Sequence, residues 1–558
     1  MDAYMKDRLK TVYRAYAEDG FRAKTAYVLP DALGVLAVHK TAKDYDTGRG
    51  KTSYYLEGTP YMRGYLLGML AEPQVSEMAI NFTDNILFDF VSAEFFNNFP
   101  LLQKLMVSLL YELCDDAYAV LPLHIHEEID GVLAGCKKAN PRTRVTKSRL
   151  IVMNTGFDAL CALVYTGGFL RERKIELPSE AVRLTMMCNA FSVFGTEAGG
   201  GHYFARDFMF ASGGVFQRNI AHILHVPKGQ PGETLHPYVS VTAPGIVGSI
   251  SAMNARGTAV SINMSPAANC DPKRLGMNSL LLARECVMRG GSAREAVRVI
   301  RDTERGVTWN YALSDGENDI ACTVEAGASW AVLDSLRYPP APWRPYLPDA
   351  AYLKAHTPEP PARGMMTRWC GAKFPAEYYA FNKGLWERYR QTVNSDIRLP
   401  PDAFMPGGFI NRAPKEKNCP SGYYFAPQRT EGNVHITTNH FLMPQMRLCA
   451  MDAWTLLIAG GQINDIQWRY DELNHQIRRA LAERGSIDYE TARKIADFLA
   501  PYGEYPVYYA KNPKSADGNR LRIEGCVSLF DLKAKTAESR YGYYGDEWVK
   551  TKLVNYLS

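Results

Sequence analysis

The 558-residue chain contains no run of eighteen apolar residues, so the sequence predicts no membrane-spanning helix. Its first twenty residues also lack the apolar core that a signal peptide needs. These two absences predict a soluble, cytoplasmic protein. A periplasmic or secreted protein whose leader has been trimmed is the alternative.

Positively and negatively charged residues are nearly balanced in number. The chain has 64 Lys and Arg against 59 Asp and Glu, a formal net charge of +5. For this length, that balance predicts no nucleic-acid partner and no anionic membrane surface as partner. Hydrophobic residues make up 46% and charged residues 22%, which excludes a disordered, collagen-like or coiled-coil chain. Small molecules or peptides are the expected ligands.

Regular cysteine patterns and the standard catalytic motifs are missing. The eleven cysteines are scattered, with no CxxC pair, which is typical of buried thiols in a reducing compartment. The sequence has no P-loop, no GxSxG, no HExxH, and no GxGxxG after a strand. It therefore predicts no cofactor.

One short segment suggests a metal site. His124, His126 and Glu127 place imidazole and carboxylate groups close together, and a metal-dependent hydrolase that uses them is an alternative function. A polar turn after Leu121-Pro122 explains the same residues without a metal. Because no partner cluster stands at a useful spacing, we predict no metal.

Hydrophobic periodicity divides the chain into helical and strand-rich parts. Residues 1–187 are predicted to be mainly helical, because apolar residues recur every three or four positions between Val75 and Val120. A turn-rich segment, Leu56–Gly68, precedes that helical pattern. Short apolar runs separated by glycines then predict antiparallel strands. The predicted strands are Met186–Phe194, His202–Phe210, Ile220–Val226, Tyr238–Val241, Ile246–Met253, Thr258–Met264, Trp309–Leu313, Ile320–Glu325, Val434–Leu442 and Cys526–Leu532.

Helices are predicted between these strands, at Leu275–Met288, from Ser292, at Gln462–Arg484 and at Tyr489–Ala500. The proline-rich stretch 338–363 predicts a long loop. This order of elements is typical of a layered α+β fold.

One thiol differs from the others in its surroundings. Cys188 opens an apolar strand, and Arg206 lies on the strand that returns after a turn near Thr196–Gly199. Such a hairpin would bring Arg206 close to the thiol and favour its thiolate form. A buried cysteine with a surface arginine is the alternative interpretation.

Several short segments between Leu56 and Asp531 resemble one known family in their order. They are Leu56–Gly64, Cys188–Phe191 with its return Ala205–Phe208, Pro244–Gly248, Met253–Gly257, Val260–Asn263, Asn310–Asp315, Val324–Glu325 and Thr437–Phe441. The chain resembles the penicillin acyltransferase-like branch of the N-terminal nucleophile (Ntn) hydrolases. It is more distantly similar to choloylglycine hydrolases, acid ceramidase and phospholipase B-like proteins.

The resemblance implies a four-layer αββα sandwich of antiparallel sheets with an N-terminal, mainly helical block. It also implies that the chain cuts itself between Met187 and Cys188. The two fragments, 1–187 and 188–558, are expected to stay together because neither can expose its apolar faces to water. The freed α-amine of Cys188, with a pKa of ~8, would then act as the base for its own thiol.

The resemblance assigns the other roles residue by residue. Asn263 corresponds to an oxyanion-hole asparagine, and Asn439 to the asparagine that steadies the tetrahedral intermediate. Arg206 corresponds to the arginine beside the thiol. Asp207 and His440 are candidate supporting or substrate-contacting residues. Where choloylglycine relatives carry an aspartate near the amine, this chain has Met209.

The implied function is a self-processing cysteine amidohydrolase or acyltransferase. It would cleave a linear C–N amide bond of a small acyl-amide through an acyl-thioester on Cys188. The alternatives are a binding protein on the same fold and a lipid or ester hydrolase of the phospholipase B-like type. The sequence does not determine the acyl group, the amine or whether the protein forms a homo-oligomer.

Overall fold

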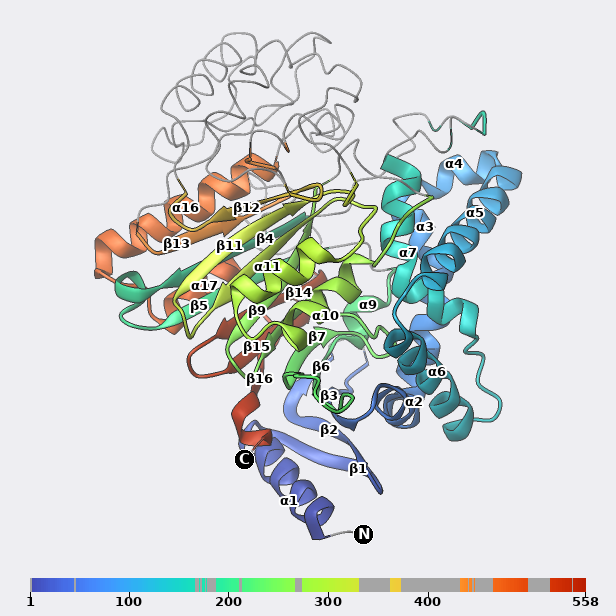
Figure 1. The fold of residues 1–558 in the computed structure, drawn as a ribbon, viewed down its shortest axis with the longest axis horizontal. Coiled ribbons are helices and arrows are strands. Elements are labelled where there is room, and N and C mark those ends of the chain that lie inside the picture. Colours follow the sequence, from blue (N-terminus) through green and yellow to red (C-terminus); the bar gives the residue numbers. More distant parts are fainter. Residues whose placement is uncertain are drawn as a thin grey trace.

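A computed structural model describes most of the chain. It covers residues 3–44, 47–165, 170, 173–175, 177, 187–209, 213–265, 273–330, 362–372, 432–439, 441–443, 446, 465–499, 522–543 and 545–557. Within these residues two β-sheets lie between layers of helices (Figure 1).

The larger sheet has ten strands in the described part of the chain. Their order is β1 (Phe21–Leu29), β2 (Ala32–Lys43), β3 (Gly50–Gly58), β6 (Ala221–Pro227), β7 (Tyr238–Thr242), β8 (Ser251–Asn254), β9 (Thr258–Met264), β10 (Trp309–Asp315), β11 (Ile320–Ala326) and β12 (Met365–Trp369). The smaller sheet has the order β13 (Val434–Thr437), β4 (Met187–Phe194), β5 (His202–Met209), β14 (Arg522–Asp531), β15 (Thr536–Tyr543) and β16 (Val549–Lys552).

Helices cover the outer face of each sheet. Helices α10 (Ser279–Arg289) and α11 (Ala293–Asp302) pack on strands β7 to β11 of the larger sheet. Helices α16 (Asp465–Arg484) and α17 (Tyr489–Leu499) pack on β13, β4, β5 and β14 of the smaller one. Strands β4 and β5 face β9 across the interface between the sheets. This arrangement confirms the predicted α+β class and its helix–sheet–sheet–helix layers.

The N-terminal part is mainly helical, as predicted. Its helices are α1 (Ala3–Glu18), α2 (Pro60–Glu77), a π-helical turn (Met78–Phe82), α3 (Thr83–Phe90), α4 (Ala93–Asn98), α5 (Pro100–Ala119), α6 (Leu123–Ala139) and α7 (Lys147–Tyr165). Strands β1 to β3, however, were not predicted. They extend the larger sheet, and β3 pairs with β6 in parallel.

The sheets are mainly antiparallel, as expected, and the β3–β6 pair is a parallel exception. Parallel neighbours need a long crossover, and the chain from residue 59 to residue 220 supplies one. This crossover passes through both the helical block and the β4–β5 hairpin. The N-terminal part is therefore built into the larger sheet. The predicted division into 1–187 and 188–558 concerns a covalent cut and stays a prediction.

Helices α2 and α6 approach so closely that only glycine fits at their crossing. A Cβ on Gly64 or Gly68 would lie 2.0 Å or 2.3 Å from a carbonyl oxygen of α6. A Cβ on Gly131 or Gly135 would lie 2.2 Å or 2.1 Å from one of α2. Leu56–Gly68 was therefore wrongly predicted as turn-rich throughout: its glycines allow close packing inside a helix that begins at Pro60.

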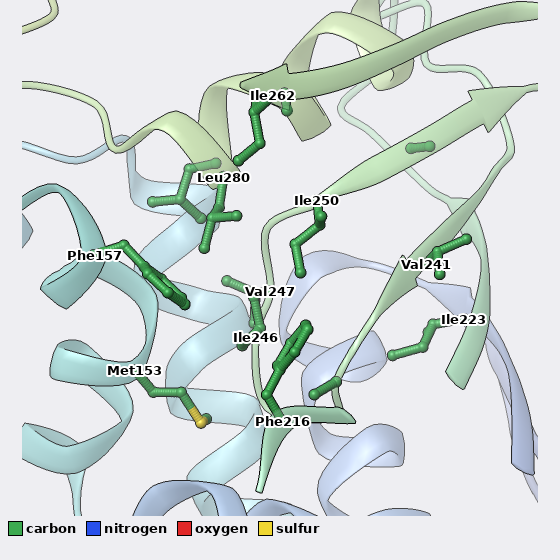
Figure 2. Close-up of a cluster of buried hydrophobic side chains, with 14 of the residues drawn as sticks. Met153, Phe157, Phe216, Ile223, Val241, Ile246, Val247, Ile250, Ile262 and Leu280 are labelled. Atoms are coloured by element: carbon green, nitrogen blue, oxygen red, sulfur yellow. The ribbon is translucent and has the colours of Figure 1, made fainter. Parts of the chain in front are cut away.

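A buried apolar core joins the helical block to the larger sheet. Figure 2 shows Met153 and Phe157 of α7 facing Ile246, Val247 and Leu280, all of them buried. The predicted strand Ile246–Met253 is shorter than expected, because only β8 pairs with its neighbours. Most of the predicted proline-rich loop lies outside the described residues. Among the described helices, none combines the length and apolar character needed to cross a membrane.

Candidate active site around Cys188

Cys188 lies near the start of β4, between the two sheets. It pairs with Phe208 of β5, and its side chain is fully buried. Its Sγ lies 3.7 Å from the backbone oxygen of Met209. The β4–β5 hairpin was correctly predicted, and it turns through Gly195–Ala198 and Gly199, whose φ of +59° favours glycine.

Asn439 holds the backbone nitrogen of Cys188. The N–H of Cys188 donates to Oδ1 of Asn439 at 2.7 Å. At the other end of its side chain, Nδ2 of Asn439 donates to the backbone oxygen of Met264 at 2.8 Å. One buried carboxamide therefore links β4 to the end of β9, and the two strands belong to different sheets.

Arg469 of α16 completes this arrangement. Its Nη1 donates to the carbonyl oxygen of Cys188 at 2.5 Å, and its Nη2 donates to Oδ1 of Asn439 at 3.0 Å. The side chain is fully buried. Sequence reasoning missed this residue, because α16 also carries Arg478, Arg479 and Arg484. Only the packing of α16 on β4 distinguishes Arg469 from them.

Arg206 is buried, which excludes the interpretation of a surface arginine. Its guanidinium donates to the backbone oxygens of Asn189, Asp207 and Ile262. Ile262 belongs to β9, so Arg206 ties the two sheets together next to Cys188. The N–H groups of the Arg206 guanidinium therefore bind backbone carbonyl oxygens near the Cys188 thiol.

Asn263 lies one residue before Met264, near the end of β9. Its side chain reaches the backbone of the segment that carries Asn439. Its Nδ2 lies 3.5 Å from the oxygen of Thr437, near the limit of a hydrogen bond. Its Oδ1 has no hydrogen-bond partner in the described part of the chain. On the paired strand, Asn310 donates to the oxygen of Thr438 at 3.0 Å. Both amides therefore support the backbone that leads to Asn439.

Asp207 points away from Arg206, as strand alternation predicts. It lies on the helix-covered face, where Nδ2 of Asn189 donates to Oδ2 at 3.5 Å. Burial raises the pKa of Asp207 to about 7, although the charges of Arg206 and Arg469 and the bond from Asn189 oppose this shift. His440, the other predicted supporting residue, lies outside the described residues.

The two histidines of the alternative metal site have separate partners. His124 Nε2 lies 2.9 Å from Oε1 of Glu285, and His126 Nε2 lies 3.0 Å from the oxygen of Leu121. The predicted polar turn is wrong, because both residues lie in the first turn of α6. No group of three or more His, Cys, Asp or Glu in the described ranges could hold a metal ion.

Comparisons with known proteins give distant likenesses. The chain matches none of the known protein-family models. It is 25% identical over 513 residues to an uncharacterized protein of Archaeoglobus fulgidus. That match spans 91% of this chain and 66%, just under two thirds, of the length of the archaeal protein.

Two solved structures show a distant likeness to this chain. One is a mutant of conjugated bile acid hydrolase from Clostridium perfringens, with 7% identity, a TM-score of 0.29, and coverage of 65% of this chain and 92% of that chain. The other is penicillin V acylase from Agrobacterium tumefaciens, with 12% identity, a TM-score of 0.23, and coverage of 64% and 76%. With scores this low, the fold assignment rests on the sheets and helices described above.

Proposed function

We propose that this chain is a self-processing cysteine amidohydrolase or acyltransferase that cleaves a linear amide bond of a small acyl-amide. The observation that carries the proposal is the hydrogen bond between the nitrogen of Cys188 and Oδ1 of Asn439. A thiol whose own backbone nitrogen is held by a buried acceptor fits chemistry in which that nitrogen becomes the base. The sequence resemblance to Ntn hydrolases supports the same assignment.

Self-cleavage would begin with attack of the Cys188 Sγ on the carbonyl carbon of Met187. A thioester forms as the peptide C–N bond breaks, and the departing nitrogen takes up a proton to become the α-amine. Water then hydrolyses the thioester, which frees the thiol and leaves a carboxylate on Met187. Asn439 and Arg469, which contact the nitrogen and the carbonyl oxygen of Cys188, would hold this residue in place.

The mature enzyme would use the freed amine as a general base. An α-amine with a pKa of ~8 accepts the thiol proton at neutral pH, and the thiolate attacks the amide carbonyl of the substrate. A side-chain amide aimed at the developing oxyanion contributes ~3–4 kcal/mol to such a transition state. Asn263 is our candidate for this donor, because within the described residues its Nδ2 makes only a long bond to the oxygen of Thr437. Since Cys188 is fully buried, we expect cleavage to uncover it.

A denaturing gel tests the proposal directly. The wild-type chain should give fragments of 187 and 371 residues, and the larger fragment should begin with Cys188. Cys188→Ala should fold but remain a single uncut chain. Cys188→Ser should cut slowly and turn over N-acyl 4-nitroanilides far more slowly than the wild type. A wild-type protein that hydrolyses these amides as one intact chain would exclude the mechanism.

The alternatives give different results in the same assays. A binding protein on this fold would show no turnover of amides or esters. A lipid or ester hydrolase of the phospholipase B-like type would hydrolyse 4-nitrophenyl esters of long acyl chains and leave the matching anilides intact.

A further inference from the structure

The short segment that carries Asn439 is held at its far end by a buried carboxylate. The N–H of Leu442 donates to Oε1 of Glu325 at 2.9 Å, and the N–H of Met443 donates to Oε2 at 2.9 Å. Glu325 lies on β11 and is fully buried. Both oxygens of one carboxylate are therefore used to fix two consecutive backbone amides just beyond Asn439.

Arg368 of β12 holds the near end of the same segment. Its Nη2 donates to the oxygen of Ile436 at 2.8 Å and to Oγ1 of Thr323 at 3.0 Å. Its Nε lies 3.5 Å from Oε1 of Glu325, so the two side chains form a buried ion pair. Thr323 in turn lies 2.5 Å from Oγ1 of Thr437.

These contacts bracket Asn439 on both sides. Ile436 precedes it by three residues and Leu442 follows it by three, and each is bonded to one member of the Glu325–Arg368 pair. A buried charge is strongly unfavourable unless it is paired and hydrogen-bonded. If either side chain moved away, the charge of the other would be left buried without its partner. The pair and the two ends of the segment are therefore fixed together.

We propose that Glu325 and Arg368 are positioning residues that set the place of Asn439 against the nitrogen of Cys188. They touch neither Cys188 nor a reacting atom. They act through the backbone of Ile436 before Asn439 and of Leu442 and Met443 after it. The proposal rests on the proposed function, because it concerns the rate at which Cys188 reacts. A displacement of about 1 Å in a catalytic group can lower a rate by 10²-fold, so loosening the segment should be visible in kinetics.

The test replaces Glu325 by glutamine, which keeps the size of the side chain. The carboxamide retains one acceptor oxygen but turns its NH₂ toward a backbone N–H, and it removes the charge that pairs with Arg368. We expect Glu325→Gln to slow self-cleavage and to lower kcat on an N-acyl 4-nitroanilide at least ~10-fold, with little change in KM. Arg368→Lys keeps the charge but loses the forked donor, so its loss of rate should be smaller.

Asp315→Asn is the matched control. Asp315 is also a fully buried carboxylate on the larger sheet, and it accepts backbone N–H groups at the start of α11 and in the turn after β10. This variant should lower the melting temperature as Glu325→Gln does, but its rate per folded molecule should equal that of the wild type. Wild-type rates for Glu325→Gln, measured per folded molecule, would overturn the proposal.

Hydrogen exchange separates this proposal from the proposed function. In the full chain, Glu325→Gln should speed exchange in a peptide covering residues 434–443, and Asp315→Asn should leave that peptide unchanged. If the wild type neither cuts itself nor turns over amides, the proposed function fails, and exchange alone decides whether the pair holds the segment. Unchanged exchange in Glu325→Gln would then overturn the positioning role.

Discussion

Oδ1 of Asn439 lies 2.7 Å from the backbone nitrogen of Cys188, although 251 residues separate them in the chain. The same oxygen accepts a second hydrogen bond, from Arg469. Such an acceptor orients the N–H of Cys188 in the uncut chain. If the proposed cleavage occurs, we expect the same oxygen to orient the freed α-amine of Cys188.

Replacement of Asn439 should therefore affect rate more than stability. Asn439→Ala removes the acceptor for Cys188 and the bond to Met264, and we expect kcat to fall by about 10²-fold or more with little change in KM. Asn154→Ala is the control, because Asn154 is also buried and bridges the oxygen of Gly245 and the nitrogen of Val247. The control should lose about 1–3 kcal/mol of stability and keep its rate per folded molecule. Equal rate losses in the two variants would contradict a role at the site.

Asn263 is expected to act on the developing oxyanion. Asn263→Ala should lower kcat by ~10²–10³ with KM little changed, and Asn263→Asp should be at least as slow because it adds negative charge. The contact with Thr437 gives the competing explanation, a strut for the backbone before Asn439. Melting curves recorded together with kcat distinguish the two, with Asn254→Ala, at a buried asparagine that ends β8, as the control. A lower melting temperature with unchanged turnover would remove Asn263 from the site.

The buried carboxyl of Asp207 should make stability depend on pH. Its pKa is raised from 3.8 to about 7 in the folded chain. Between these values the folded state binds a proton that the unfolded state has lost, so the free energy of unfolding contributed by this group falls as pH rises. Asp207→Asn lacks this titration, so its stability relative to the wild type should rise from pH 5 to pH 8. Urea unfolding at four pH values measures the difference, and parallel curves for the two proteins would show that Asp207 does not titrate there.

The crossing of α2 and α6 should not tolerate a methyl group. Gly131→Ala would place its Cβ 2.2 Å from the oxygen of Tyr61, and we expect a loss of about 1–3 kcal/mol as the helices separate. Gly156→Ala in α7 is the control, since its nearest neighbour is a Val152 methyl group at 3.1 Å. There the helix-propensity gain of about 0.5–1 kcal/mol offsets the crowding. Similar melting temperatures for both variants would contradict the close packing.

Local pattern predicted most of the strands around the site. Short apolar runs predicted β4, β5 and β9, and the glycines after Phe194 predicted the hairpin that pairs Cys188 with Phe208. The helix predicted to start from Ser292 is also confirmed, since the Ser292 side chain accepts from the N–H of Glu295 at the start of α11. In each case the residues that form the pattern lie within a few positions of the strand, turn or helix end that they predict, so local sequence is sufficient.

Other features were missed because their signals are not local. Strands β1 to β3 were assigned to a helical block, and their place in the larger sheet depends on β3 meeting β6 after a long crossover. In the sequence alone the glycines of α2 indicate a turn. The structure shows that they allow the backbone of α6 to approach closely.

The sequence by itself determined the strand that opens at Cys188, its return through Arg206, and the alternation that sends Asp207 to the opposite face. Only the tertiary structure decided which atoms meet Cys188. Arg469 and Asn439 reach it from segments remote in sequence, and Glu325 and Arg368 hold Asn439 from the other sheet. The physical reason is that periodicity fixes the face on which a side chain lies, whereas a hydrogen bond between two sheets depends on how those sheets pack.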